Sequence, residues 1–478
     1  MPLTRVWSVL KLVILEPALF LYIVVSFIRL PIFQSLVYQK VCYSKYGYDL
    51  FDSPCSNQTF AHQDKQLQTE ASHVFLLSTI CVSLPAIFMS VILGSLSDKL
   101  SRKLPILIPF AGLLLQDLND LVQTTYLQYS VYWLLLSDFL FGCCGGFISL
   151  LSTIFTYAIC NAPSLKHRSY RMAFLEGSVG VGGTVGFVVS GILLKAVGYQ
   201  KLFLISTIVH FLTFFYLLFR VPDIAPLRAE EEEESTSTYN IFAWIGRFFS
   251  QAVRVVFRKR SEHLRLYIVL VLLAFALEDI TFAGSQDINF YYLKHQLGWG
   301  TETYGYFSGI QFGTGSFAIL VLFPLLRKYW LSDTLLAEIG FLTKSVGLFC
   351  MAFVFSTWFA FFVCAFYTFS RFIAAGLRTT VSRLVEPNEQ GKIFGAIALT
   401  EGICSLIATS IFNALYPVSL NFFPGLSYLI LGFVLLTAAV LTAVVHLKAG
   451  PRVREDQNIS VSVQDDSIYD SVYGAISE

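Results

Sequence analysis

The chain has 478 residues, of which 55% are hydrophobic, 16% aromatic and 14% charged, and its formal net charge is +1. A soluble domain carries about 25% charged residues, so this composition excludes an ordinary soluble protein and indicates a chain that lies mostly in a lipid bilayer. A net charge near zero argues against nucleic acid as a partner. The sequence shows no phosphate-binding P-loop and no hydrolase, kinase or redox motif. We therefore expect neither an enzyme nor a bound cofactor or metal.

Twelve apolar segments follow one another along the chain, each long enough to cross a bilayer, which takes about 20 residues. The first carries Glu16 and Arg29 and ends at no signal-peptide cleavage site, so we interpret it as a membrane helix. The pattern predicts an all-α membrane protein with two bundles of six helices. The predicted spans are 8–38, 73–97, 104–124, 130–159, 172–194, 201–220, 264–293, 303–326, 333–356, 358–382, 393–416 and 421–446.

The same pattern predicts four parts: an N-terminal bundle (1–220), a linker (221–263), a C-terminal bundle (264–447) and a disordered tail (448–478). The linker contains an acidic run followed by Ser and Thr, which indicates disorder, and then a basic amphipathic stretch typical of a membrane surface. In the tail, two Tyr-x-x-bulky motifs begin at Tyr469 and Tyr473 and resemble sorting signals. Trafficking adaptors are therefore candidate partners of the tail.

The basic residues give an orientation, because cytosolic loops carry an excess of Lys and Arg. Most of them lie in the loops on one side, with the two termini and the linker, so we expect both termini in the cytosol. The opposite side carries only Lys40, Lys45, Lys65, Lys195, Lys201 and Lys294.

The polar loop 39–72 is thereby predicted to be lumenal or extracellular. It holds Cys42 and Cys55 and the glycosylation sequon that begins at Asn57. A disulfide and a glycan are both compatible with that side of a membrane. The other cysteines lie in or beside apolar spans without metal-binding spacing.

A charged turn at 94–103 joins the second and third spans. Gly94, Asp98, Arg102 and Lys103 occur with spacing that resembles the signature loop between helices 2 and 3 of major facilitator transporters. Gly94 would let a neighbouring helix approach closely, and the basic pair would hold the turn in the cytosol. The alternative is an ordinary basic hairpin.

Ionisable residues inside spans are costly and therefore indicate function. Glu176 precedes glycines at 180, 182, 183 and 186, so tight helix packing would leave it poorly hydrated, as a proton-coupling acid requires. The alternative is a structural hydrogen bond. Asp279 and Asp287 lie on either side of Gly284 in the seventh span and are further proton-coupling candidates.

Arg371 and Arg378 are seven residues apart in the tenth span, so they lie two turns apart on one helix face. A guanidinium in a membrane cavity suits an anionic substrate, because it forks onto a carboxylate and keeps its charge. The alternative is an internal salt bridge to Glu401 or Asp279. Asp138 in the fourth span is a secondary substrate-site candidate, whereas Glu16, Asp117, Glu338 and His210 are expected to be packing or interfacial residues.

Several short segments along nearly the whole chain resemble the proton-coupled folate transporter family, solute carrier family 46, within the major facilitator superfamily. This resemblance implies proton-driven transport of organic anions by alternating access, with Glu176 as coupling acid and Arg378 as cavity arginine. The markers are Glu16-Pro17, Cys55-Ser56-Asn57, Ser97-Asp98 with Arg102, Arg171-Met172-Ala173 through Glu176, Gly284-Ser285-Gln286-Asp287-Ile288, Gly305-Tyr306, Ala337-Glu338-Ile339-Gly340, Arg378 with Ser382-Arg383-Leu384-Val385, Glu389-Gln390-Gly391 and Phe412-Asn413-Ala414-Leu415-Tyr416-Pro417.

Three departures separate the chain from the folate carrier. Phe282 stands at that carrier's span-7 histidine position and Cys143 at its span-4 aspartate position. Gly298 replaces the cysteine that there ties the first loop to the loop after span 7, so we expect Cys42 to bridge Cys55 within the loop, with free thiols as the alternative.

The departures disfavour folate itself as the substrate. Other members of the family are associated with lysosomal or endosomal export of steroid conjugates and small peptides, so the expected location is the plasma membrane or an endosomal or lysosomal membrane. The rival hypothesis is a receptor or scaffold that keeps the transporter fold without transport.

Overall fold

The computed structural model describes residues 15–47, 55, 64–99, 101–160, 165–223, 256, 258, 264–328, 332–385 and 390–448. Long helices make up almost all of these residues, which confirms the predicted all-α fold. The helices are α2 (Glu16–Tyr46), α4 (Lys65–Lys99), α5 (Leu104–Thr125), α6 (Trp133–Cys143), α7 (Gly146–Cys160), α8 (Leu165–Arg220), α10 (Leu264–Leu297), α11 (Thr301–Phe317), η2 (Ala318–Leu322), α12 (Phe323–Lys328), α13 (Asp333–Ala352), α14 (Thr357–Tyr367), α15 (Arg371–Leu384), α16 (Gln390–Ser419) and a last helix (Leu426–Lys448).

The described residues contain 11 helical segments that are long and apolar enough to cross a membrane, against twelve predicted spans. The difference lies in α8, whose 56 residues are broken at Gly198, with φ +74° and ψ 174°. Only glycine adopts that backbone conformation without strain. Its two parts correspond to the fifth and sixth predicted spans, so the twelve crossings are present.

The first loop is shorter than predicted. α2 continues to Tyr46 and α4 already begins at Lys65, so Cys42 lies in a helix rather than in a polar loop. Burial explains the extension, since Val37, Tyr38, Val41 and Cys42 are all packed in the protein core. The glycosylation candidate Asn57, nearly all of the linker and the tail beyond Lys448 lie outside the described residues.

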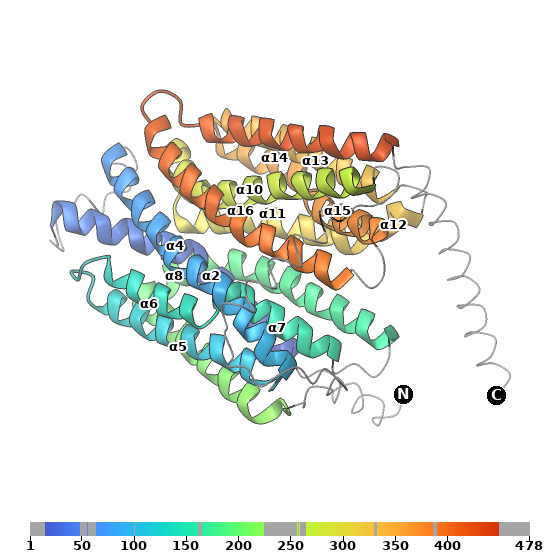
Figure 1. Cartoon of the computed structure of the whole chain (residues 1–478). Helices are drawn as coiled ribbons and strands as arrows, with labels where there is room; N and C mark the ends of the chain where they lie inside the picture. The colour runs from blue at the N-terminus through green and yellow to red at the C-terminus, as the bar shows by residue number, and fades with distance from the viewer. Residues whose placement is uncertain are drawn as a thin grey trace, which may run out of the picture.

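The helices form two groups, α2 to α8 and α10 to the last helix, which appear in Figure 1 as the blue-to-green and the yellow-to-red halves. We call them the N-bundle and the C-bundle. They meet along two seams, where α8 packs against α11 and α4 against α16.

Glycines allow α8 and α11 to pack at a short distance from each other. A Cβ on Gly180 would lie 3.1 Å from Ser316, and one on Gly191 would overlap the backbone of Glu302. Gly305, on α11, faces the α8 backbone in the same way, at the carbonyl oxygen of Phe187. Small residues let helix backbones approach closely in a membrane, so this sequence of glycines fixes how the two bundles touch.

Polar contacts join the bundles near the end that carries the first loop. Tyr416 donates to Gln68 at 3.0 Å, and the hydroxyl of Ser72 donates to the side chain of Asn413 at 3.2 Å. On the α8–α11 seam, Lys195 pairs with Glu302 at 3.2 Å. The bundles are thus held together at the first-loop end. A transporter must open such contacts to expose a central site to that side.

Candidate functional site

An exposed ion pair lies in the middle of the C-bundle. Arg378 on α15 pairs with Glu401 on α16, and their side chains are 45% and 35% exposed. The guanidinium also lies 5.5 Å from the ring centre of Phe275 on α10. Charged groups that faced hydrocarbon at this depth would be unstable. Their exposure therefore indicates a water-accessible space next to these three helices.

A second ion pair, between α10 and α13, is more buried than the first. Lys344 on α13 donates to Glu278 on α10 at 2.8 Å, and both side chains are nearly buried. Asp279, the next residue, interacts electrostatically with both ion pairs. Its Oδ2 atom is buried and has no hydrogen-bond partner among the described residues.

We call Glu278, Asp279, Lys344, Arg378 and Glu401 the C-bundle cluster. It combines three carboxyl groups with two basic groups. If all five groups were charged, one negative charge would remain uncompensated at membrane depth, which is costly. The arrangement therefore favours one bound proton, and Asp279 is the carboxyl group left without a hydrogen-bond partner.

Asp287, two turns further along α10, belongs to the contacts between the bundles. Its carboxylate accepts a hydrogen bond from Asn413 at 3.0 Å. Asn413 in turn accepts from Ser72 on α4, in the other bundle. A change in the charge of Asp287 can therefore reach the seam that closes the first-loop end.

Glu176 lies on α8, but its side chain is outside the described residues. Its backbone is one turn before Gly180, which faces Ser316 on α11. Arg371 lies beside the same part of α11, with its guanidinium 4.1 Å from the ring centre of Phe312. Gly180 and Arg371 thus meet the same part of α11, and the backbone of Glu176 lies one turn before Gly180.

Arg371 and Arg378 come from one helix but have different surroundings. Arg371 packs against α11, where its side chain lies 3.4 Å from the position of a Cβ on Gly315. Arg378 pairs instead with α16. The structure therefore does not bring the two arginines together as a stacked pair.

Asp138 lies inside the N-bundle and is only 1% exposed. It accepts hydrogen bonds from Ser78 and Gln116, and one of its oxygens lies 3.9 Å from Arg29. Arg29 in turn makes a close ion pair with Asp120, at 2.7 Å. These contacts of Asp138 are all with residues of the N-bundle and not with the C-bundle cluster.

Sequence reasoning assigned no role to Arg29 and did not single out Asp120. One signal was available: Asp117 and Asp120 are three residues apart, so both project from one face of a membrane helix. Asp117 does pack as expected, against His210 at 2.6 Å.

The charged turn after α4 is tied to the end of α8. Lys103 donates to the carbonyl oxygen of Leu218 at 2.6 Å, and Ser101 donates to Asp223 at 2.9 Å. The side chain of Asp98 is outside the described residues. A Cβ on Gly94 would meet no atom of the described residues within 4 Å, so the close helix approach expected there is not seen in that part of the chain.

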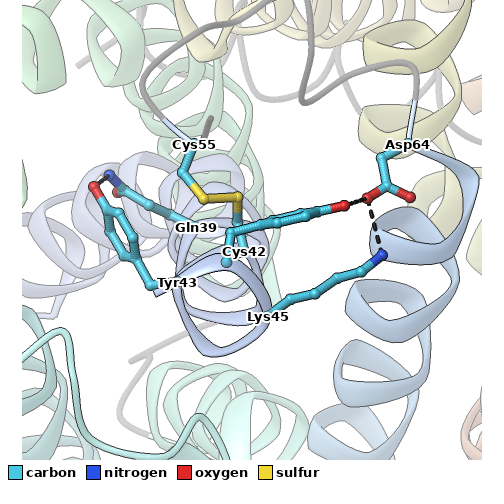
Figure 2. The surroundings of a disulfide bond; sticks show 7 residues. Gln39, Cys42, Tyr43, Lys45, Cys55 and Asp64 are labelled. Carbon is cyan, nitrogen blue, oxygen red and sulfur yellow. Dashed lines mark hydrogen bonds and ion pairs between the residues drawn. A yellow bond between two sulfur atoms is a disulfide. The ribbon is translucent and has the colours of Figure 1, made fainter. Parts of the chain in front are cut away.

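Figure 2 shows the first-loop end of α2, where the predicted disulfide between Cys42 and Cys55 is confirmed. Beside it, Asp64 accepts from Lys45 at 3.0 Å and from the hydroxyl of Tyr46. Its other oxygen caps α4 by accepting from the backbone N–H of Leu67 at 3.1 Å. Partial burial raises the pKa of Asp64, but these hydrogen bonds outweigh it and hold the pKa below its usual value.

Comparison with known proteins identifies the family. The profile described as Major Facilitator Superfamily matches residues 57–409. The chain belongs to this superfamily. The predicted absence of an enzymatic activity agrees with that assignment, since the related proteins are transporters.

Two curated relatives confirm the resemblance to solute carrier family 46. The "Proton-coupled folate transporter" of Rattus norvegicus is 28% identical over 434 residues, which cover 90% of this chain and 91% of the relative. The "Lysosomal proton-coupled steroid conjugate and bile acid symporter SLC46A3" of Homo sapiens is 26% identical over 445 residues, 91% of this chain and 95% of the relative.

Solved structures share the fold at low sequence identity. A POT family transporter in complex with 5-aminolevulinic acid has a TM-score of 0.60 and 16% identity, covering 92% of this chain and 96% of that chain. The human organic anion transporter MFSD10 (TETRAN) has a TM-score of 0.62 and 13% identity, covering 90% of this chain and 98% of that chain. These likenesses support the major facilitator fold alone.

Proposed function

We propose that the protein is a proton-coupled secondary transporter that moves a small organic anion by alternating access. The observation that carries this proposal is the C-bundle cluster, in which a water-accessible arginine and an unpartnered carboxyl group share one electrostatic network. Arg378 supplies the fork for an anionic group, and Asp279 supplies the site for a proton.

Coupling follows from the charge balance of the cluster. When an anionic substrate binds Arg378, Glu401 loses part of its counter-charge and the cluster becomes more negative. An anion is repelled less when Asp279 holds a proton, because that proton brings the cluster's own charge to zero, so substrate and proton bind best together. Each then raises the affinity for the other by the same factor, as linkage requires.

Two further residues connect this site to movement. Asp287 bridges to the first-loop seam through Asn413, so its charge can control opening on that side. Glu176, the acid that the family resemblance assigns to proton coupling, is proposed as a further group on the path of the proton to or from Asp279, and the position of its backbone beside the α8–α11 seam supports a role in rocking the bundles. The turn at Asp98, Arg102 and Lys103 would control the opposite opening.

An amphipathic anion of the steroid-conjugate class fits better than a folate. Phe282, which replaces a histidine of the folate carrier, is 51% exposed and lies 5.7 Å from the ammonium of Lys344. With Phe275 against Arg378, the cationic groups are flanked by apolar rings. Such a surface suits a molecule with a large apolar body and one acidic group. Small peptides and muropeptides are the further candidates.

We propose the membrane in which the protein resides from its relatives and its orientation from the charges of its loops. The chain spans a membrane many times, and a lysosomal relative makes an endosomal or lysosomal membrane the first candidate, with the plasma membrane second. The loop charges support cytosolic termini, a lumenal first loop with a glycan on Asn57, and a tail open to trafficking adaptors.

The test is uptake by proteoliposomes under an imposed pH gradient, with a panel of folates, conjugated steroids, muropeptides and cyclic dinucleotides. We expect acid on the substrate side to stimulate uptake of a conjugated steroid. Glu176→Gln should abolish that stimulation and spare exchange between bound pools. Binding without flux for every member of the panel would favour the receptor or scaffold instead.

A further inference from the structure

The N-bundle contains an ionisable network that the proposed transport site does not use. On α2, Arg29 donates from Nε to Asp120 Oδ2 at 2.8 Å, and its Nη2 atom lies 2.7 Å from the same oxygen as an ion pair without hydrogen-bond geometry. The same Nη2 atom lies 3.9 Å from Asp138 on α6. Two carboxyl groups on different helices therefore share one guanidinium.

A histidine–aspartate pair lies one helical turn away. Asp117, on the same face of α5 as Asp120, contacts His210 of α8 at 2.6 Å. The side chains of Asp117, Asp120 and His210 are completely buried, and that of Asp138 is nearly so. Only Arg29, with 17% of its side chain exposed, reaches solvent within this network.

Several polar atoms aimed into the network have no partner. Asp120 Oδ1, Asp117 Oδ1 and His210 Nε2 are buried and accept or donate no hydrogen bond within the described residues. An ionised carboxylate with a bare, buried oxygen carries the full cost of desolvation. A proton on that oxygen removes the charge that causes the cost.

The charges that surround the network do not balance it. Three carboxyl groups face one permanent cation, so neutrality requires two protons, one in the Asp117–His210 pair and one shared by Asp120 and Asp138. The next cation on α2, Lys40, is eleven residues or about 16 Å beyond Arg29 and is bound to backbone carbonyl oxygens of Gln123, Tyr126 and Leu127. The other groups that face the network are Tyr22 on α2, Ser78 and Cys81 on α4, and Gln116 on α5.

We propose that the N-bundle holds a proton-binding site of its own, in which Asp120 and Asp138 share one proton beside Arg29. The ligand is the proton alone. The site is built from α2, α5 and α6, whereas the C-bundle cluster is built from α10, α13, α15 and α16. Arg29 contacts one oxygen of Asp120, and Ser78 and Gln116 occupy both oxygens of Asp138, so the bare Oδ1 atom of Asp120 is the place left for the proton.

Infrared difference spectroscopy on the purified protein in lipid tests this directly, because a neutral carboxylic acid has a carbonyl stretch apart from carboxylate and amide bands. The variants are Asp120→Asn and Asp138→Asn, with Glu302→Gln as the control, since Glu302 is exposed and paired with an exposed lysine. No substrate is added, so the result does not depend on the proposed transport.

We expect the wild-type band to lose one carboxylic acid in either aspartate variant and to remain unchanged in the control. Should Asp120→Asn fail to fold, Ser78→Ala keeps every charge and removes one donor to Asp138, so the pH at which the band titrates should rise. An identical band in the aspartate variants that fold, together with an unshifted titration in Ser78→Ala, would overturn the proposal.

Discussion

The N-bundle and the C-bundle both hold charged residues at membrane depth, but they hold them differently. In the N-bundle, Asp117, Asp120 and His210 are completely buried around a mostly buried Arg29. In the C-bundle, Arg378 and Glu401 are 45% and 35% exposed. A buried ion pair resists change because separating its partners leaves an unpaired charge, whereas an exposed one can exchange partners with a ligand. The contrast therefore indicates that the buried network of the N-bundle contributes mainly to stability, whereas the exposed pair of the C-bundle can exchange partners with a substrate.

The largest effect should come from breaking the buried network. Arg29→Gln removes the cation of the network and leaves an ionised carboxylate buried and unpaired, which should lower the free energy of unfolding by about 3–5 kcal/mol. Arg378→Gln, the matching change in the exposed pair, should cost about 0–1 kcal/mol. Thermal unfolding of both purified variants in the same lipid or detergent measures the difference. Equal losses of stability in the two variants would remove the distinction between the bundles.

The exposed pair should dominate transport instead. Arg378→Ala removes the group proposed to bind the substrate anion, and a charge-assisted hydrogen bond of about 1.5–3 kcal/mol corresponds to an apparent affinity about 10–150 times weaker. Arg378→Lys keeps the charge without the fork and should have an intermediate effect. The concentration dependence of uptake measures both, with Arg265→Ala, an exposed arginine at the start of α10, as control. Wild-type affinity in Arg378→Ala excludes this residue from the substrate site.

Breaking a contact at the first-loop end of the seam should have a smaller effect, which appears in how readily the two bundles open there. Ser72→Ala removes one hydrogen bond between the bundles, worth about 1 kcal/mol, and should favour opening toward the first loop by about fivefold. A thiol-reactive probe at a cysteine introduced in place of Ala71, the buried residue before Ser72, can report this opening. Thr69→Ala changes a hydroxyl that bonds only to its own helix and serves as the control. Unchanged labelling in Ser72→Ala would mean that this contact does not hold the seam.

The smallest effect concerns the ion pair of Asp64 with Lys45 beside the disulfide. Because the pKa of Asp64 is held below its usual value, its contribution to stability is present above the unfolded pKa of about 4 and is lost as pH falls through the lower folded pKa. It should therefore persist at the acidity of a lysosome. Asp64→Asn should lower stability by at most about 1 kcal/mol at neutral pH and flatten the pH dependence below pH 4. A variant with an unaltered pH profile there would contradict this assignment.

Much of the fold could be predicted from the sequence, because long apolar segments and the glycine at 198 determine where helices cross and break. The isolated charges of the C-bundle were also visible, since Arg378, Asp279 and Glu401 interrupt apolar helices. Which charges pair could not be predicted, because pairing depends on how helices rotate about their axes. Glu401 was one of two candidate partners of Arg378, and the pairing of Lys344 with Glu278 was not anticipated.

The predictions that the structure did not match also depend on how the helices pack against one another. Asp120 lies in a polar stretch near the end of a span, so its complete burial depends on Arg29 approaching from another helix. Asp138 was predicted at the substrate site from its span alone, but α6 turns it toward α2, α4 and α5 inside the N-bundle. The packing expected at Gly94 requires a neighbouring helix at that point, and a glycine in the sequence does not specify one.

The central claim is that the C-bundle cluster carries the coupled proton, and substrate-driven proton movement tests it most directly. Proteoliposomes containing a pH-sensitive dye are given a gradient of a transported anion with no initial pH gradient. We predict that the wild-type protein moves protons with the substrate, and that Asp279→Asn abolishes this proton flux while it still exchanges labelled substrate. Proton flux at the wild-type rate in Asp279→Asn would contradict the account.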